Sequence, residues 1–182
     1  MMIKIMVYAL TAMLGLFSSI ALAEGDAYQI EVIIFMQAMP STEVFDQTTS
    51  QITWPSDLTE LSAYKKPENT TLDDSYAALS RDSTYQPISH IAWVQPAGES
   101  GLGAPVHLQS IKSGLNGYIQ IQRVQGLQMT VDLELSSNSG NNSGESIIYR
   151  LNEKRPIKLN EVYYLDHPKF GVVLKVTGLP PL

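Results

Sequence analysis

The side chains that could carry out catalysis are few and widely spaced. The chain has three histidines, His90, His107 and His167, and none belongs to an HExxH or HxH pair of the kind that binds zinc. Ser100 lies in a GESG stretch, which differs in spacing from the GxSxG nucleophile elbow. Cysteine is absent, which excludes disulfides and thiolate chemistry, and no GxGxxG or P-loop signals a nucleotide. We therefore predict no enzyme activity, no cofactor and no metal site.

Two carboxylates could form a catalytic pair. Asp132 and Glu134 are two residues apart in a predicted strand, so they share one face, as paired carboxylates of a glycosidase could. The apolar residues of this strand alternate with them, and Gln128 and Thr130 occupy the same face as the acids. We interpret this face as solvated rather than as an active site.

A basic segment interrupts an otherwise acidic chain. Its four cations are Arg150, Lys154, Arg155 and Lys158, with Glu153 as the single anion among them. These cations could bind ligand carboxylates, with arginine suited to bidentate contacts. They could equally protect an edge strand against aggregation. Both interpretations stay open.

A second segment of interest lies near the C-terminus. Asp166, His167 and Pro168 predict a stiff structural turn that extends to Gly171, in which the carboxylate binds the imidazole or nearby backbone amides. Tyr164 precedes this turn. The segment could serve structure alone, or it could form a binding surface.

The elements that must position these residues are mostly strands. Tyr28 to Phe35 predicts a central strand, and Thr71 is expected to cap a helix that ends near Arg81. His90 is expected to be a satisfied core histidine. Residues 136–144 are too polar to pack and predict a loop. The other predicted strands are 88–94, 106–111, 118–123, 127–135, 147–151, 161–165 and 170–177.

The predicted fold class is α+β. Strands outnumber helices and βαβ alternation is absent, so we expect a mostly antiparallel β-sheet with one or two helices between the first two strands. Residues 24–182 are long enough for one domain with a core, and no second domain or repeat is visible.

The N-terminus predicts a signal peptide over residues 1–23, cleaved after Ala23. Lys4 precedes an apolar run over residues 5–17, and Ala21 and Ala23 provide small residues before the cleavage point. A retained anchor is the alternative, but the run is shorter than the roughly 20 residues that a span needs. No later segment is expected to span a membrane. Export and the lack of cysteine favour the bacterial periplasm.

The formal net charge of the chain is −6 at pH 7. A surface this acidic is a poor match for nucleic acid, whose phosphates reward basic proteins. We therefore expect no nucleic-acid partner.

Three stretches have distinctive sequences: residues 28–35 read YQIEVIIF, residues 90–96 read HIAWVQP and residues 164–171 read YLDHPKFG. In this order they resemble the opening strand, the central strand and the C-terminal signature of the CsiV family. These are periplasmic proteins of gammaproteobacteria that bind peptidoglycan. The chain departs from the family at Tyr163, where a histidine is usual, and at Pro156, which interrupts the basic strand.

The resemblance implies a non-enzymatic protein that binds peptidoglycan and supports cell-wall synthesis and cell shape. It also implies partnership with LpoA, the outer-membrane lipoprotein that activates a bifunctional peptidoglycan synthase. On this interpretation Trp93, Tyr164 and His167 are candidate contacts to peptidoglycan, with the rings of Trp93 and Tyr164 stacking on sugars, and the four cations of the basic segment meet stem-peptide carboxylates. Trp93 could instead belong to the core. Two other functions stay open: an adaptor that regulates a wall synthase with incidental glycan contact, and a wall hydrolase.

Overall fold

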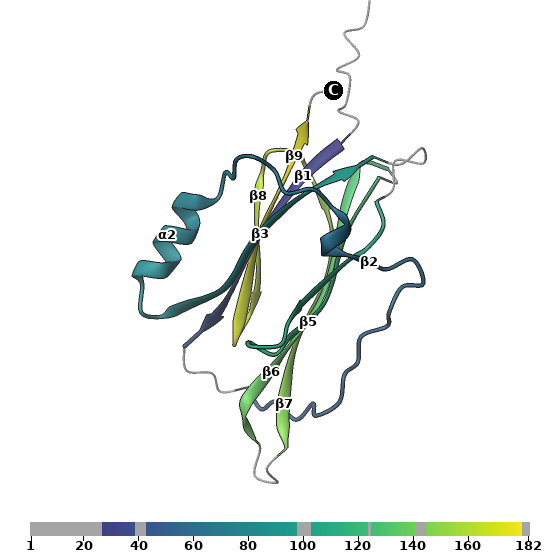
Figure 1. Cartoon of the computed structure of the whole chain (residues 1–182). Helices are drawn as coiled ribbons and strands as arrows, with labels where there is room; N and C mark the ends of the chain where they lie inside the picture. The colour runs from purple at the N-terminus through teal and green to yellow at the C-terminus, as the bar shows by residue number, and fades with distance from the viewer. Residues whose placement is uncertain (1–26, 39–42, 98–102, 124, 141–144, 180–182) are drawn as a thin grey trace, which may run out of the picture.

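The computed structural model describes residues 27–38, 43–97, 103–123, 125–140 and 145–179. The predicted signal peptide, residues 1–23, lies outside the described residues. Two β-sheets and one α-helix make up the described fold (Figure 1). The elements are β1 (Ala27–Gln37), β2 (Thr59–Glu60), the 3-10 helix η1 (Leu61–Ala63), α2 (Asp73–Arg81), β3 (Tyr85–Pro96), β4 (Val106–Ser110), β5 (Leu115–Arg123), β6 (Leu127–Gly140), β7 (Ser146–Ile157), β8 (Val162–His167) and β9 (Phe170–Leu179).

The first sheet has the strand order β3-β1-β9-β8, and the second has the order β2-β4-β5-β6-β7. Every pairing is antiparallel except that of β2 with β4, so the mostly antiparallel prediction is confirmed. The helix, however, follows β2 and therefore lies between the second and third strands, not between the first two. A strand of two residues is too short to show the alternation by which sequence reveals strands.

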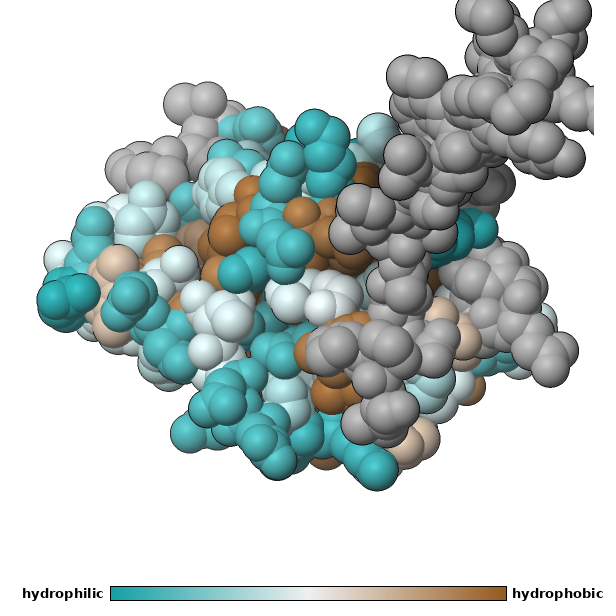
Figure 2. All heavy atoms as spheres, turned by 90° about the horizontal axis from the view of Figure 1, so that it is seen from above, coloured by the Kyte–Doolittle hydropathy of each residue, from teal (hydrophilic) through white to brown (hydrophobic). Residues whose placement is uncertain are grey.

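The main core lies between the two sheets. Ile30, Val32 and Ile34 of β1 are almost fully buried, as are alternate residues of β6 such as Val131 and Leu133. Each such side chain contributes roughly 1.5–3 kcal/mol by leaving water. Seen from the end where β9 finishes, the visible surface is mostly hydrophilic, with apolar side chains showing in patches (Figure 2).

The helix α2 packs on the outer face of the first sheet, where Leu72 meets Ile33 and Phe35. Thr71 is not the N-cap as predicted; that position belongs to Leu72, whose side chain makes no capping bond. The carboxylate of Glu31 on β1 instead accepts bonds from the amides of Thr71 at 2.8 Å and Leu72 at 2.9 Å. A buried acid from another element thus replaces the local cap.

His90 is partly buried beside this cap, with its side chain 15 % exposed. Its Nε2 lies 2.8 Å from Oε1 of Glu31. Burial would raise the pKa of Glu31, but the bonds from His90 and the amides of Thr71 and Leu72 hold it below its usual value.

A strap, residues 43–58, crosses the outer face of the second sheet from the β7 edge to β2. Figure 1 shows it in dark blue, passing the lower part of β6 and β7 and rising to β2. The amide of Ile148 donates to the carbonyl of Gln47 at 2.8 Å, which ties the strap to the β7 edge.

The strap overturns the prediction that Asp132 and Glu134 are solvated. They are only 2 % and 4 % exposed. Oε1 of Glu134 accepts bonds from the side chain of Gln47 at 2.9 Å and the amide of Gln51 at 2.8 Å. The acids do lie on the face opposite the core, but a segment without regular structure covers that face.

The predicted loop over residues 136–144 is shorter in the structure. Strand β6 continues to Gly140 and β7 begins at Ser146. Residues 141–144 lie outside the described residues. Pairing between the two strands extends the hairpin into a sequence whose composition alone favours a loop.

Candidate functional site

The basic segment lies on β7, the last strand of the second sheet, and its cations divide between two faces. Arg150 faces the strap side and makes a bidentate contact with Asp132, at 2.8 and 2.9 Å. These hydrogen bonds raise the pKa of Arg150. Lys154 is exposed and forms no ion pair with any described residue. Of these two cations on the same face, Arg150 is thus bound to a carboxylate of its own chain, whereas Lys154, among the described residues, is not.

The other two cations of this segment also have acidic neighbours. Nη1 of Arg155 lies 3.0 Å from Glu153, and its guanidinium lies 5.6 Å from the centre of the Tyr163 ring. Nζ of Lys158 lies 3.5 Å from Glu161. The structure does not gather the predicted cations into one open site.

Trp93 belongs to the core. Its side chain is 1 % exposed and its Nε1 donates to Oε1 of Gln95 at 3.1 Å. The ring has no free face on which a sugar could stack, so of the two interpretations the structure favours the core.

The C-terminal signature forms the β8–β9 hairpin, with Pro168 and Lys169 in the turn between the two strands. Oδ1 of Asp166 accepts bonds from the Tyr164 hydroxyl at 2.7 Å and from Nε2 of Gln37 at 2.6 Å. Among the described residues, neither His167 nor a backbone amide donates to this carboxylate, contrary to the prediction. The acid therefore orients Tyr164 rather than closing the turn.

Tyr164 is 49 % exposed and lies nearly parallel to Phe35, with the ring centres 6.2 Å apart. Gly171 makes this stack possible, because a Cβ at that position would lie 2.5 Å from Cζ of Phe35. Burial raises the pKa of Tyr164, and the bond to Asp166 raises it further. The result is a fixed, neutral aromatic ring on the surface of the first sheet.

His167 lies on the other side of the hairpin in an aromatic cluster with Phe45, Tyr149 and Phe170. The ring centres of these three residues lie 5.3, 5.9 and 5.2 Å from that of His167. Burial lowers the pKa of His167, which favours the neutral ring, and its Nδ1 accepts a bond from the amide of Lys169 at 3.2 Å. The cluster joins the hairpin to the strap and to β7.

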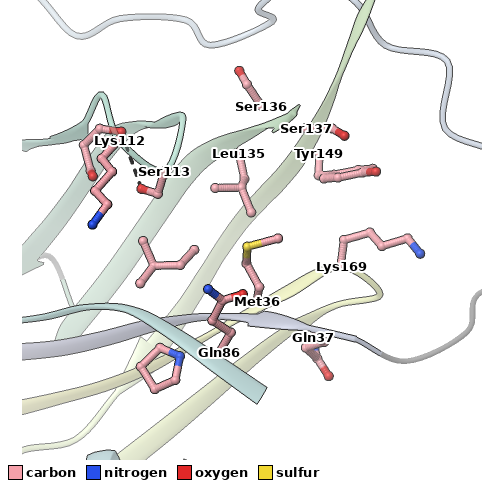
Figure 3. Close-up of a pocket in the computed structure, with 13 residues that line it drawn as sticks. Met36, Gln37, Gln86, Lys112, Ser113, Leu135, Ser136, Ser137, Tyr149 and Lys169 are labelled. Carbon is pink, nitrogen blue, oxygen red and sulfur yellow. Dashed lines mark hydrogen bonds between the residues drawn. The ribbon is translucent and has the colours of Figure 1, made fainter. Parts of the chain in front are cut away.

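Beside this cluster, a cleft of about 470 Å³ opens between the two sheets; we call it the end cleft (Figure 3). It lies at the C-terminal end of β1, which is the end of the strand away from the Ala27–Leu179 pair. Its lining combines an apolar part with polar side chains and two lysines. The lining residues are Met36, Gln37, Gln86, Pro87, Ile88, Ser110, Lys112, Ser113, Leu135, Ser136, Ser137, Tyr149 and Lys169.

The turns that carry the two lysines are anchored by backbone bonds. Gly114 adopts a φ of 72° after Lys112, and its carbonyl accepts a bond from the amide of Ser136 at 3.0 Å. A side chain at Gly114 would be strained and would approach the carbonyl of Ser136 to 2.9 Å. The carbonyl of Lys169 accepts a bond from the amide of Gln37 at 2.9 Å. Both lysines therefore extend from fixed backbones.

A second cleft, the side cleft, has a volume of about 780 Å³ and lies between β3 and β4. Its histidines already have partners: His90 is bound to Glu31, and His107 lies 2.8 Å from Glu60 and 2.9 Å from Asn116. Burial would lower the pKa of His107, but the bonds to Asn116 and Glu60 raise it above its usual value. We therefore regard the end cleft as the stronger candidate.

The sequence comparison decides the family. A family model described as "Peptidoglycan-binding protein, CsiV" matches residues 55–179, more than half of the chain. The chain belongs to the CsiV family. No curated protein and no solved structure gives a significant match.

The CsiV match covers β2 to β9 and therefore the whole signature hairpin. It begins after β1 and most of the strap, so Met36 and Gln37 are the residues of the end cleft outside it. Sequence reasoning missed Lys112, Tyr149 and Lys169 because they come from separate strands and turns. The one feature of the sequence that could have pointed to the site was the position of Lys169 inside the C-terminal signature, residues 164–171.

Two further findings bear on the CsiV chain. In the described part of the chain, no group of three or more histidines and acids is arranged to hold a metal ion. Within the same residues, no helix has the length and apolar character needed to cross a membrane.

Proposed function

We propose that this chain is a non-enzymatic, periplasmic peptidoglycan-binding protein that supports cell-wall synthesis and cell shape, and that it binds its ligand at the end cleft. The observation that carries the location is the convergence of the signature hairpin, through Lys169 and the His167 cluster, on the margin of an open cleft. Family membership supports peptidoglycan as the ligand.

The composition of the end cleft suits a ligand that is both polar and apolar. Met36, Ile88 and Leu135 offer apolar surface, while serines, glutamines and Tyr149 offer hydrogen bonds. Peptidoglycan presents the same mixture, since its sugars and peptides combine hydroxyls and amides with apolar faces and methyl groups.

The lining also supports binding without catalysis. Among the residues that the structure describes, the lining has no histidine and no carboxylate, the side chains that most often act as general acid or base in hydrolysis. Asp132 and Glu134, the pair that could have served a glycosidase, are committed to Arg150 and to the strap.

Tyr164 is proposed as a second contact to the glycan. Its ring is half exposed, is held by Phe35 and Asp166, and presents a face to solvent. A preoriented aromatic ring suits stacking on a sugar because little side-chain entropy is lost on binding.

The proposal is tested by co-sedimentation of residues 24–182 with purified sacculi over a range of protein concentrations. Saturable retention is the expected result, and release of soluble muropeptides is not expected. Absence of saturable retention would contradict peptidoglycan binding, whereas muropeptide release by the pure protein would instead establish a hydrolase.

An adaptor function, with LpoA as partner, is the second candidate. The observation that favours it is the free edge of β8, where Val162 and Tyr164 are 54 % and 49 % exposed, because exposed apolar side chains of this kind commonly form protein interfaces. If Val162→Glu abolishes capture by LpoA in the absence of peptidoglycan but leaves retention on sacculi intact, the β8 edge is the adaptor surface. Unchanged capture would remove this surface from consideration.

A further inference from the structure

The end cleft is positively charged in an acidic chain. Lys112 and Lys169 are the only charged residues among the described ones that line it, while the chain as a whole has a formal net charge of −6. A cleft lined by charge of one sign concentrates the field and raises the local concentration of oppositely charged ligands. The cleft therefore selects for anions.

Neither lysine is neutralised. Among the described residues, neither forms an ion pair, and Nζ of Lys169 lies 6.0 Å from the centre of the Phe45 ring. Arg150, Arg155 and Lys158 each have a carboxylate within 3.5 Å. Lys112 and Lys169 thus keep their capacity for an external partner.

The arrangement also indicates the shape of the anion. Figure 3 shows Lys112 and Lys169 at opposite sides of the cleft, with Leu135 and Met36 between them. A ligand that satisfies both lysines must carry anionic groups that are separated by a partly apolar body.

We propose that the end cleft binds the stem peptide of peptidoglycan through its free carboxylates, with Lys112 and Lys169 as the contacts; this rests on the proposed function. The glycan chains are uncharged, because the lactyl carboxyl group is consumed in the bond to the peptide. The stem peptides carry separated carboxylates and alanine methyl groups. Of the two components, only the peptide matches both the charge and the apolar middle of the cleft.

The test compares two double variants with the same change in charge. Lys112→Met with Lys169→Met removes the cleft cations, and Lys154→Met with Lys158→Met removes two exposed lysines of the β7 region. We expect retention on sacculi to weaken about tenfold for the cleft variant and to change less than twofold for the control. Thermal unfolding of both variants checks that the fold is intact.

Two ligand comparisons use the unmodified protein and therefore do not depend on the folding of a variant. Glycan strands stripped of peptide by an amidase, with the lactyl carboxyl groups that this cleavage frees then converted to amides, should retain the protein at least fivefold less than intact sacculi. A soluble stem tripeptide with free carboxylates should shift amide resonances of Lys112, Ser136 and Lys169, and the same peptide with amidated carboxyl groups should not.

The outcomes separate the inference from the proposed function. Equal retention on stripped glycan and intact sacculi, with the cleft variant unimpaired, would overturn stem-peptide recognition and leave peptidoglycan binding in place. No retention on sacculi would contradict peptidoglycan binding, and the soluble-peptide titration would then still decide the chemistry of the cleft. Resonance shifts confined to the β7 region would also overturn the inference.

Discussion

On β7, Arg150 and Arg155 each contact a carboxylate of their own chain, whereas Lys112 and Lys169 reach the end cleft without one. The first pair belongs to a run of cations that is obvious in the sequence, and the second comes from two turns far apart in it. The difference follows from what the side chains of β7 and those of the two turns face. Arg150 lies across the sheet from buried acids on β6, while the turns of Lys112 and Lys169 face an opening between the sheets.

The contrast teaches that clustering along the chain is a poor guide to free charge. An edge strand with many cations can satisfy them internally and still be protected against pairing with other chains. Two isolated lysines without a carboxylate partner among the described residues can define a ligand site. The predictions below test whether the β7 cations are indeed structural and the hairpin region functional.

The largest effect on stability is expected from Arg150→Met. This change leaves the carboxylate of Asp132, which is 2 % exposed, without its bidentate partner. Breaking one side of a buried ion pair costs about 3 kcal/mol. Urea unfolding should show this loss, while Lys154→Met, on the same strand and face, should stay within about 0.5 kcal/mol of the unaltered protein. A loss equally small for Arg150→Met would mean that this cation is not structural.

Gly171→Ala should have the next largest effect on stability. The added Cβ would lie 2.5 Å from Phe35 and 3.1 Å from Tyr164, so the aromatic stack must shift, at a cost of about 2 kcal/mol. Gly178→Ala on the same strand is the control, because its nearest neighbour is the end of the Leu159 side chain at 3.3 Å. Denaturant midpoints that move equally for both variants would contradict a special role for Gly171.

Tyr164→Ala should weaken retention on sacculi by about 1 kcal/mol, or roughly fivefold, with a small effect on stability. Tyr164→Phe is the matched control, since it keeps the ring and loses only the hydroxyl, which donates to Asp166 and accepts from Gln37. Co-sedimentation should rank the alanine variant well below the phenylalanine variant. If the two variants bind equally, the ring is not a contact and the end cleft acts alone.

The smallest effect is the pH dependence of stability, where His167 and His107 should act in opposite directions. The folded-state pKa of His167 is lowered by burial, so the unfolded chain takes up a proton first and stability falls as the pH drops below about 6.5. The pKa of His107 is raised, so its contribution is present below about 6.5 and is lost as the pH rises through the folded-state pKa.

Denaturant unfolding between pH 5 and pH 8 can separate these contributions. His167→Gln should lessen the loss of stability in acid, and His107→Gln should lessen the loss at higher pH. Identical pH profiles for the two variants would contradict the opposite signs.

Much of the fold could be predicted because strands such as β1 and β6 show clear alternation. The strap could not, because residues 43–58 have no periodicity and are held by bonds from single side chains and amides to a distant sheet. Because the strap has no periodicity, the sequence did not reveal that it covers Asp132 and Glu134, and these residues were predicted to be exposed. Alternation along a strand identifies two faces but does not reveal what lies over the second one.

The candidate site was predicted only in part for a similar reason. Sequence placed Tyr164, Asp166 and Gly171 in one segment, and the structure shows that they act with Phe35 and Gln37 of β1. The end cleft exists only after six segments meet, so no local spacing could signal it. The prediction that Thr71 caps the helix was wrong for the same reason. The carboxylate that performs this role comes from Glu31, far away in the chain.

The pairing of β1 with β9 affects how the domain assembles. Ile30 lies opposite Val176, so the centre of the first sheet joins segments from opposite ends of the described chain. A polypeptide that emerges N-terminus first cannot complete this sheet until β9 has also emerged, and contacts so distant in sequence form slowly. The topology therefore delays completion of the first sheet until β9 is available to pair with β1.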